Sequence, residues 1–86
     1  MSYWLYILRC ADGTLYTGTT DDVKRRAAAH NSGKGAKYTR GRGPVTVVYH
    51  EEHPDKSAAL KREIAVKKLS RGDKLALIEA GPILSR

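Results

Sequence analysis

Two short segments that favour strands flank the dipeptide Asp12-Gly13, and this arrangement constrains the fold more than any other feature of the chain. Residues Tyr3–Arg9 are rich in aromatic and aliphatic side chains and predict a buried strand, and Leu15–Thr19 predicts a second short strand. An Asp-Gly pair between two such segments is a strong hairpin signal. The chain therefore begins with an antiparallel pair of strands, which excludes an all-parallel sheet.

The length of the hairpin loop decides which faces of the sheet the tyrosines occupy. A two-residue loop would place Tyr6 and Tyr16 on opposite faces. A three-residue loop, Ala11-Asp12-Gly13, with its glycine in the left-handed conformation, would bring both rings to one face and pair Tyr6 with Gly18. We predict the three-residue loop, and we expect Gly18 to leave space beside Tyr6 for another group to approach the backbone. Two core tyrosines with hydroxyls at the rim are the alternative interpretation.

Three helices and one further strand are expected after the hairpin. This β-β-α-β-α-α order predicts one α/β domain of the α+β type over residues 1–86, with a three-stranded antiparallel sheet flanked by three helices. The expected elements are a helix over 21–30 capped by Thr20 and ended by Asn31-Ser32-Gly33, a strand over 44–49, a helix over 55–69, and a helix over 73–79 capped by Asp73.

The chain is strongly basic, with 16 Lys and Arg against nine Asp and Glu and a net charge of +7. A field of this sign attracts polyanions, so nucleic acid is the expected partner. An anionic membrane surface, or a solvated surface without any partner, is the alternative. With 86 residues, the chain has no room for a large cofactor cavity.

Cysteine and histidine give no sign of a metal or disulfide framework. Cys10, the single cysteine, cannot form an internal disulfide and is expected to fill space in a buried strand. Together with the lack of a secretory leader, it predicts a cytoplasmic protein, and the apolar run 3–8 is too short to span a membrane. His50 and His53 are three residues apart before Pro54, so we predict a solvated turn there rather than a zinc site.

The hairpin and the segments after it resemble the GIY-YIG nuclease superfamily. Trp4-Leu5-Tyr6 corresponds to a degenerate first triplet, and Tyr16-Thr17-Gly18 corresponds to the second. The segment 20–26 leading to His30 is similar to the family's helix that carries Arg and His, and Ala58–Glu63 is similar to the helix with the single acidic metal ligand. The likeness spans residues 3 to 80 and is closest to small bacterial proteins that consist of this domain alone.

The resemblance implies a divalent-metal-dependent endonuclease that hydrolyses DNA phosphodiester bonds with one Mg²⁺ or Mn²⁺ ion. Branched or single-stranded DNA and a role in DNA repair or recombination are the implied context. Trp4 stands where the family usually has Gly, and the Asn that often follows its last helix is absent, so a noncatalytic nucleic-acid-binding module is the alternative. The catalytic residues implied are Tyr6, Tyr16, Arg26, His30 and Glu63, with Glu63 as the metal ligand.

The implied metal ligand is chemically reasonable. Mg²⁺ keeps several waters and takes few carboxylates besides substrate phosphate, so a lone Glu63 can suffice. Leu60 and Ile64 are expected to form the buried apolar stripe of this helix, with Glu63 beside it. An ion pair between Glu63 and Lys67, four residues on, is the alternative.

The implied arginine, histidine and tyrosines also suit phosphodiester chemistry. Arg26 and His30 are four residues apart and share a helix face that turns toward the sheet. Arg26 can clamp a phosphate oxygen, and His30 can hold a phosphate oxygen or the attacking water, with helix capping as the alternative for His30. We assign Tyr16 as the base and Tyr6 as the group that orients the water, with the reverse assignment open.

Contacts to DNA are expected from cations outside the catalytic set. The aperiodic segment Lys34–Gly43 is predicted to be a mobile basic loop, in which Tyr38 can stack on a base. Such contacts are mostly to phosphate, so we expect weak, salt-sensitive and largely nonspecific binding. The residues predicted to contact DNA are Arg25, Lys34, Lys37, Tyr38, Arg40, Arg42, Lys67 and Lys68.

Overall fold

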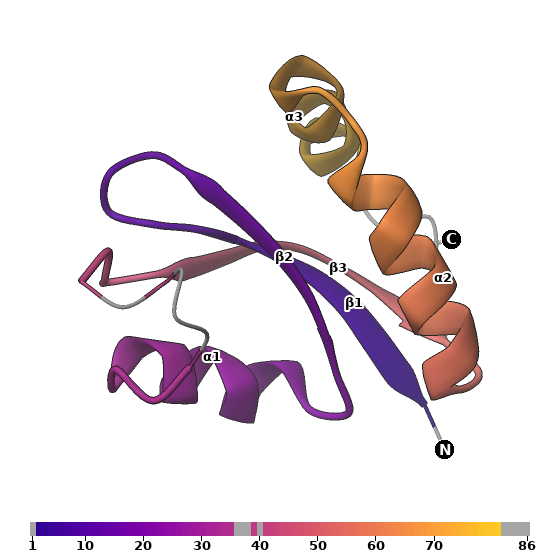
Figure 1. The fold of residues 1–86 in the computed structure, drawn as a ribbon, viewed down its shortest axis with the longest axis horizontal. Helices are drawn as coiled ribbons and strands as arrows, with labels where there is room; N and C mark the ends of the chain where they lie inside the picture. The colour runs from indigo at the N-terminus through magenta and orange to yellow at the C-terminus, as the bar shows by residue number, and fades with distance from the viewer. Residues whose placement is uncertain (1, 36–38, 40, 82–86) are drawn as a thin grey trace.

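Three antiparallel strands form one sheet in the order β2-β1-β3, with β1 in the centre. The strands are β1 (Tyr3–Arg9), β2 (Leu15–Thr20) and β3 (Thr46–His53) in a computed structural model that describes residues 2–35, 39 and 41–81. Helix α1 (Val23–Asn31) lies on one side of the sheet, and α2 (Lys56–Lys67) and α3 (Arg71–Ala80) lie on the other (Figure 1). The predicted fold class and element order are confirmed.

The hairpin has the predicted three-residue loop. Tyr6 pairs with Gly18 and Leu8 with Tyr16, so both tyrosines lie on the face that α1 covers. The Cys10 amide donates to the Thr14 carbonyl at 2.9 Å, and Gly13 has a φ of 87°, a left-handed value that glycine adopts without strain.

Each face of the sheet carries its own apolar cluster. Leu5 and Ile7 pack with Tyr49 and Val66 on the side of α2. The opposite cluster, on the side of α1, consists of Tyr6, Leu8, Cys10 and Val45. Cys10 is buried, as predicted.

Helix α1 begins two residues later than expected, because its N-cap is Asp22 and not Thr20. The Asp22 carboxylate accepts a hydrogen bond from the Arg25 amide at 3.0 Å, which satisfies one of the free donors of the first turn. The Thr20 hydroxyl instead accepts from the Asp22 amide at 3.2 Å. At the other end, Asn31 accepts from the Val45 amide at 2.6 Å and donates to its carbonyl at 3.2 Å, which ties α1 to the start of β3.

The third strand is longer than expected, so the prediction of a turn at residues 50–53 is wrong. β3 continues to His53, which pairs with Tyr3, because the central strand β1 offers hydrogen-bonding partners along its full length. His50 and His53, both on β3, contact different residues. The His50 ring meets Trp4 edge-on with centroids 5.3 Å apart, and His53 Nε2 lies 2.7 Å from Glu51.

Helices α2 and α3 differ from expectation in their bounds and in the face that α2 buries. Asp55, expected as the first residue of its helix, is the N-cap of α2, and Ser70 caps α3 in place of Asp73, whose amide donates to the Ser70 hydroxyl at 3.1 Å. The expected stripe of Leu60 and Ile64 is wrong. Those side chains are exposed, since α2 packs the smaller Ala59 and the Val66 two turns later against the sheet. Among the helices that the structure describes, none is long and apolar enough to cross a membrane.

The buried hydroxyl of Thr17 gives a stability prediction. Thr17 lies on β2 opposite Ile7, and within the described residues its Oγ1 is buried without a hydrogen-bond partner. We expect Thr17→Val to raise the free energy of unfolding by about 1 kcal/mol, because it removes an unsatisfied polar atom at nearly constant volume. Urea unfolding measures this. Thr20→Val, which loses the hydroxyl bonded to Asp22, should destabilise instead, and destabilisation by both variants would contradict the prediction.

Candidate functional site

The candidate site is built on the tyrosine pair of the hairpin. The Tyr6 and Tyr16 rings lie 6.4 Å apart, and Tyr6 is 1% exposed. Gly18 leaves space at the backbone, but Tyr6 itself fills that space. A Cβ at Gly18 would lie 2.6 Å from the Tyr6 hydroxyl. The glycine therefore allows the Tyr6 ring to lie across β2.

His30 points from the last turn of α1 into this tyrosine pair. Its Nε2 lies 3.0 Å from the Tyr6 hydroxyl, and its Nδ1 lies 2.7 Å from the Thr39 hydroxyl. Its ring centroid is 5.3 Å from that of Tyr16. The alternative of a helix-capping histidine is not supported, since both ring nitrogens have side-chain partners within the site.

The buried position of His30 keeps its ring neutral near pH 7. Burial lowers the pKa of His30 below its usual value of 6.5, and the positive charge of Arg26 lowers it further. A neutral imidazole has one donor and one acceptor nitrogen, which matches the two hydroxyl partners, Tyr6 and Thr39.

This shift predicts an acid-dependent loss of stability. The unfolded chain binds a proton at His30 near pH 6.5, whereas the folded protein does so only at lower pH. The free energy of unfolding should therefore fall as the pH drops below 6.5, by at most about 1.4 kcal/mol per pH unit. Urea unfolding at pH values from about 7.5 to about 5 tests this. In the His30→Gln control, the free energy of unfolding should lose this dependence on pH.

An independent measurement keeps that prediction falsifiable if His30→Gln folds poorly. An NMR titration of the wild-type imidazole should give a pKa below 6.5 for His30. A value above 6.5 would contradict it. Glu51 does not obscure the result, because its pKa is held below 4.5 and its contribution is lost only under more acidic conditions.

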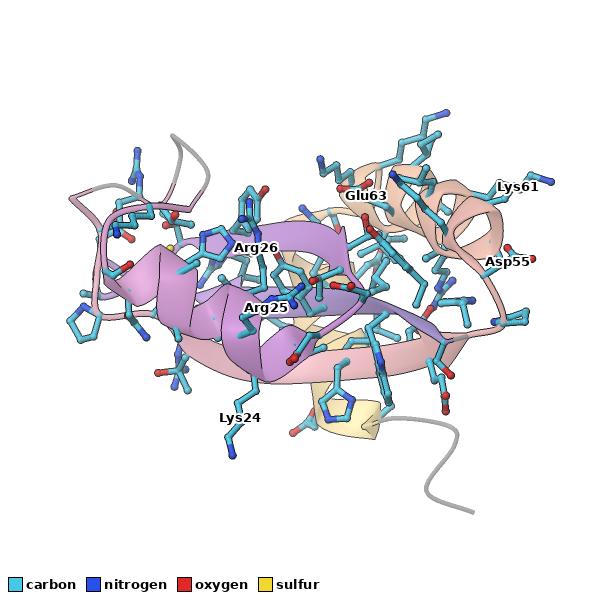
Figure 2. The ribbon with its side chains drawn as sticks, turned by 90° about the horizontal axis from the view of Figure 1, so that it is seen from below. Lys24, Arg25, Arg26, Asp55, Lys61 and Glu63 are labelled. Carbon is cyan, nitrogen blue, oxygen red and sulfur yellow. The ribbon has the colours of Figure 1, made fainter. Side chains whose placement is uncertain are left out.

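Arg26 on α1 and Glu63 on α2 both affect the pKa of Tyr6. Burial raises the pKa of Tyr6 to about 12. A hydrogen bond from Arg26 opposes the increase, and Tyr16 and the negative charge of Glu63 add to it. Figure 2 shows Arg26 of α1 and Glu63 of α2 on the same side of the molecule, with Lys24 pointing away from both. The other four predicted catalytic residues therefore all act on Tyr6, by ring contact, hydrogen bonding or charge.

Glu63 is a half-buried carboxylate with one cationic neighbour. Its side chain is 17% exposed, and its Oε2 lies 3.1 Å from the Nζ of the exposed Lys67, so the alternative ion pair is present. An exposed pair at this spacing contributes only about 0.3–0.5 kcal/mol, which leaves the carboxylate available to a cation. Within the described part of the chain, no three His, Cys, Asp or Glu side chains form a metal cluster. A lone carboxylate fits Mg²⁺, which draws its other ligands from water and substrate phosphate.

A charged network on the opposite face holds the turn of α2 that carries Glu63. The Glu51 carboxylate accepts hydrogen bonds from Tyr49 at 2.6 Å and from Arg62, the residue before Glu63, at 2.8 Å. Burial alone would raise the pKa of Glu51, but the hydrogen bonds from Tyr49, His53 and Arg62 hold it below its usual value. This network ties α2 to β3 and so fixes the position of Glu63 relative to the sheet.

Of the predicted DNA-contacting residues that the structure describes, Lys67 contacts the cluster through its ion pair with Glu63. Arg25 is exposed and forms an ion pair with Asp21 at 2.6 Å, and Arg42 pairs with Asp12 of the hairpin loop at 2.5 Å. Lys34, Lys67 and Lys68 are exposed. The remaining predicted contacts, Lys37, Tyr38 and Arg40, lie outside the described residues, as does part of the predicted mobile segment.

Two residues that the sequence does not single out support His30. Thr39 is 1% exposed and holds the His30 Nδ1, and Gly35 packs so closely that a Cβ there would lie 2.2 Å from this nitrogen. Both belong to an aperiodic segment, in which no pattern distinguishes them from their neighbours. Only the folded contact with His30 reveals their role.

Trp4, which replaces the usual glycine of the first triplet, lines a separate pocket. This pocket of about 470 Å³ lies at the N-terminal end of α1, and Val23, Val47 and His50 also line it. None of the predicted catalytic residues lines it. Trp4 therefore lines a pocket that is separate from the tyrosine cluster.

Comparison with known proteins places this arrangement in a family. A model of the GIY-YIG catalytic domain matches residues 2–76. A UPF0213 protein of Streptococcus sanguinis is 55% identical over 76 residues, which cover 88% of this chain and 87% of that protein. A UPF0213 protein of Halobacterium salinarum is 56% identical over 73 residues, which cover 85% of this chain and 95% of that protein.

A solved structure shows the same fold. The solution NMR structure of a UPF0213 protein from Bacillus halodurans superposes with a TM-score of 0.61 at 51% identity, covering 93% of this chain and 85% of that one. The matched family model spans both tyrosine triplets, the Arg26–His30 helix and the helix of Glu63. The chain belongs to the GIY-YIG nuclease family.

Proposed function

We propose that the protein is a divalent-metal-dependent endonuclease that hydrolyses DNA phosphodiester bonds. Membership of a nuclease family supports a nucleic-acid substrate. The observation that carries the proposal is the gathering of a guanidinium, an imidazole, a second phenol and one carboxylate around the Tyr6 hydroxyl. With Tyr6, these groups come from two strands and two helices, and they can supply the charge stabilisation and proton transfer that phosphodiester hydrolysis uses.

Arg26 is assigned to the phosphate. Arg26 lowers the pKa of Tyr6 and of His30, so its positive charge acts on both of these residues. A guanidinium can bind two phosphate oxygens at once and cannot lose its charge at neutral pH. Arg26 would therefore orient the scissile phosphate and stabilise the charge that develops on it.

Glu63 is the residue that would hold one Mg²⁺ or Mn²⁺ ion. When bound, such an ion supplies positive charge to the phosphate at the point of attack. Lys67 would have to give up its ion pair with Glu63, and its exposed ammonium could then contact a neighbouring phosphate.

The two tyrosines receive different roles. The pKa of Tyr6, raised to about 12, keeps this phenol protonated at neutral pH, so it can donate a hydrogen bond but is not in the form that accepts a proton. This supports Tyr6 as the group that orients the attacking water, together with the neutral His30 bonded to it. Tyr16 is left as the proton acceptor of the pair.

Cleavage with and without metal tests the proposal. Purified protein should nick plasmid DNA in Mg²⁺ or Mn²⁺ at least about 100-fold faster than in EDTA, and cleavage of branched, single-stranded and duplex oligonucleotides would reveal the preferred substrate. Arg26→Ala, purified in parallel, controls for contaminating nucleases and should be inactive. DNA binding without cleavage in any metal would overturn the proposal in favour of a noncatalytic nucleic-acid-binding module.

A further inference from the structure

Two exposed aliphatic side chains share a helix face with the proposed metal ligand. Leu60, Glu63, Ile64 and Lys67 follow the spacing i, i+3, i+4, i+7, which places them along one face of α2. Leu60 is 39% exposed and Ile64 is 59% exposed, whereas the Glu63 side chain is only 17% exposed. Leu60 and Ile64 are therefore more exposed than Glu63, the carboxylate whose negative charge adds to the increase in the pKa of Tyr6.

Lysines surround this pair. Lys56 and Lys68 lie one turn before Leu60 and one turn after Ile64, Lys61 is adjacent in sequence, and all three are exposed. Glu63 is the single acidic residue in the α2 sequence. The surface thus combines apolar side chains with concentrated positive charge, directly beside the candidate site.

We propose that Leu60 and Ile64 pack against unstacked bases of the nucleic acid, beside the proposed metal ligand Glu63. This inference rests on the proposed nucleic-acid substrate. A nucleic-acid strand presents phosphates and apolar base faces side by side, which is the combination that lysines around two aliphatic residues can bind. Leu and Ile are among the side chains that proteins insert at base steps.

Charge and composition disfavour other occupants of this face. A second copy of the chain would bring two proteins of charge +7 together through their lysines, which opposes association. A membrane surface would require a broader apolar face than two aliphatic side chains provide. Because unstacking a base step in duplex DNA costs a few kcal/mol, the face should favour DNA whose bases are already unstacked.

The test is a binding assay with Leu60→Ala/Ile64→Ala in EDTA, where the proposed cleavage does not occur. Fluorescence anisotropy would use labelled single-stranded, bulged and continuous duplex oligonucleotides. We expect the double variant to bind the single-stranded and bulged DNA about ten-fold more weakly and the continuous duplex within about two-fold of wild type. The salt dependence should not change, because no phosphate contact is removed.

Leu75→Ala provides the matched control. Leu75 is 44% exposed and lies on α3, away from the Glu63 face of α2, so its removal should alter binding to none of the three DNAs. The thermal unfolding midpoint of both variants should stay close to that of wild type, since the substituted side chains are exposed.

Several results would overturn the inference. Equal wild-type affinity for the three DNAs would do so, as would unchanged binding by the double variant. A wild-type dimer in sedimentation, or binding to anionic phosphatidylserine vesicles, that the double variant loses would assign the face to another occupant. A preference for DNA with unstacked bases, observed without metal-dependent cleavage, would reject the proposed nuclease activity but not this inference. Cleavage without a contribution from Leu60 and Ile64 would reject this inference alone.

Discussion

Glu63→Gln should reduce metal-dependent DNA cleavage by at least about a thousand-fold while DNA affinity stays within about two-fold of wild type. The amide keeps the size of the side chain but removes the charge that a divalent ion requires. Of the five clustered residues, Glu63 is the single carboxylate, and no group of three metal-ligating side chains within the described residues could replace it. Loss of its ion pair with Lys67 costs little stability, because the pair is exposed on the lysine side.

Single-turnover cleavage at saturating protein measures the Glu63 effect, and anisotropy in EDTA measures binding. Glu79→Gln, at an exposed position on α3, is the matched control and should cleave like wild type. A readout independent of activity is available, since the charge of Glu63 raises the pKa of Tyr6. The variant should therefore titrate Tyr6 at lower pH in an ultraviolet absorbance titration. Wild-type cleavage by Glu63→Gln would reject the metal assignment.

The sequence predicted the features that depend on local backbone chemistry. The Asp12-Gly13 turn allowed few loop geometries, and the three-residue loop alone placed Tyr6 and Tyr16 on one face, as the structure has them. The side-chain period of two in a strand then fixed the tyrosine cluster. The i, i+4 spacing of Arg26 and His30 turned both toward it.

Features that depend on competition between similar residues were not predictable. Thr20 and Asp22 are both good N-caps, and the position of α1 after β2 decided between them. On α2, Leu60 and Ile64 are more hydrophobic than Ala59, yet close packing on the sheet required the smaller side chain. Thr39 and Gly35 lie against His30 only in the folded chain, and no periodicity in the sequence indicates these contacts.

Gly18→Ala is expected to destabilise the protein by about 3 kcal/mol, near the upper end of the range for overpacked cores. The added Cβ would lie 2.6 Å from the Tyr6 hydroxyl oxygen, 2.8 Å from Tyr6 Cζ and 3.1 Å from Tyr16 Cε2. Tyr6 is 1% exposed and bonded to His30, and Gly18 is paired with Tyr6 in the sheet, so neither can move without breaking other contacts. Cleavage should fall with stability, because relief of the clash displaces Tyr6.

Urea unfolding compares Gly18→Ala with Gly72→Ala, a matched glycine substitution. The nearest atom to a Cβ at Gly72, Ser70 Oγ, is 3.9 Å away, and Gly72 lies in α3, so alanine there should be neutral or stabilising by up to about 1 kcal/mol. A double-mutant cycle with Tyr6→Phe identifies the cause of the Gly18 effect. Removing the hydroxyl takes away the atom closest to the new Cβ, so Tyr6→Phe should cost less in the Gly18→Ala background than in wild type. Additive effects would mean that the Tyr6 ring does not lie against Gly18, and the geometry that places Arg26, His30 and Glu63 around its hydroxyl would then be wrong.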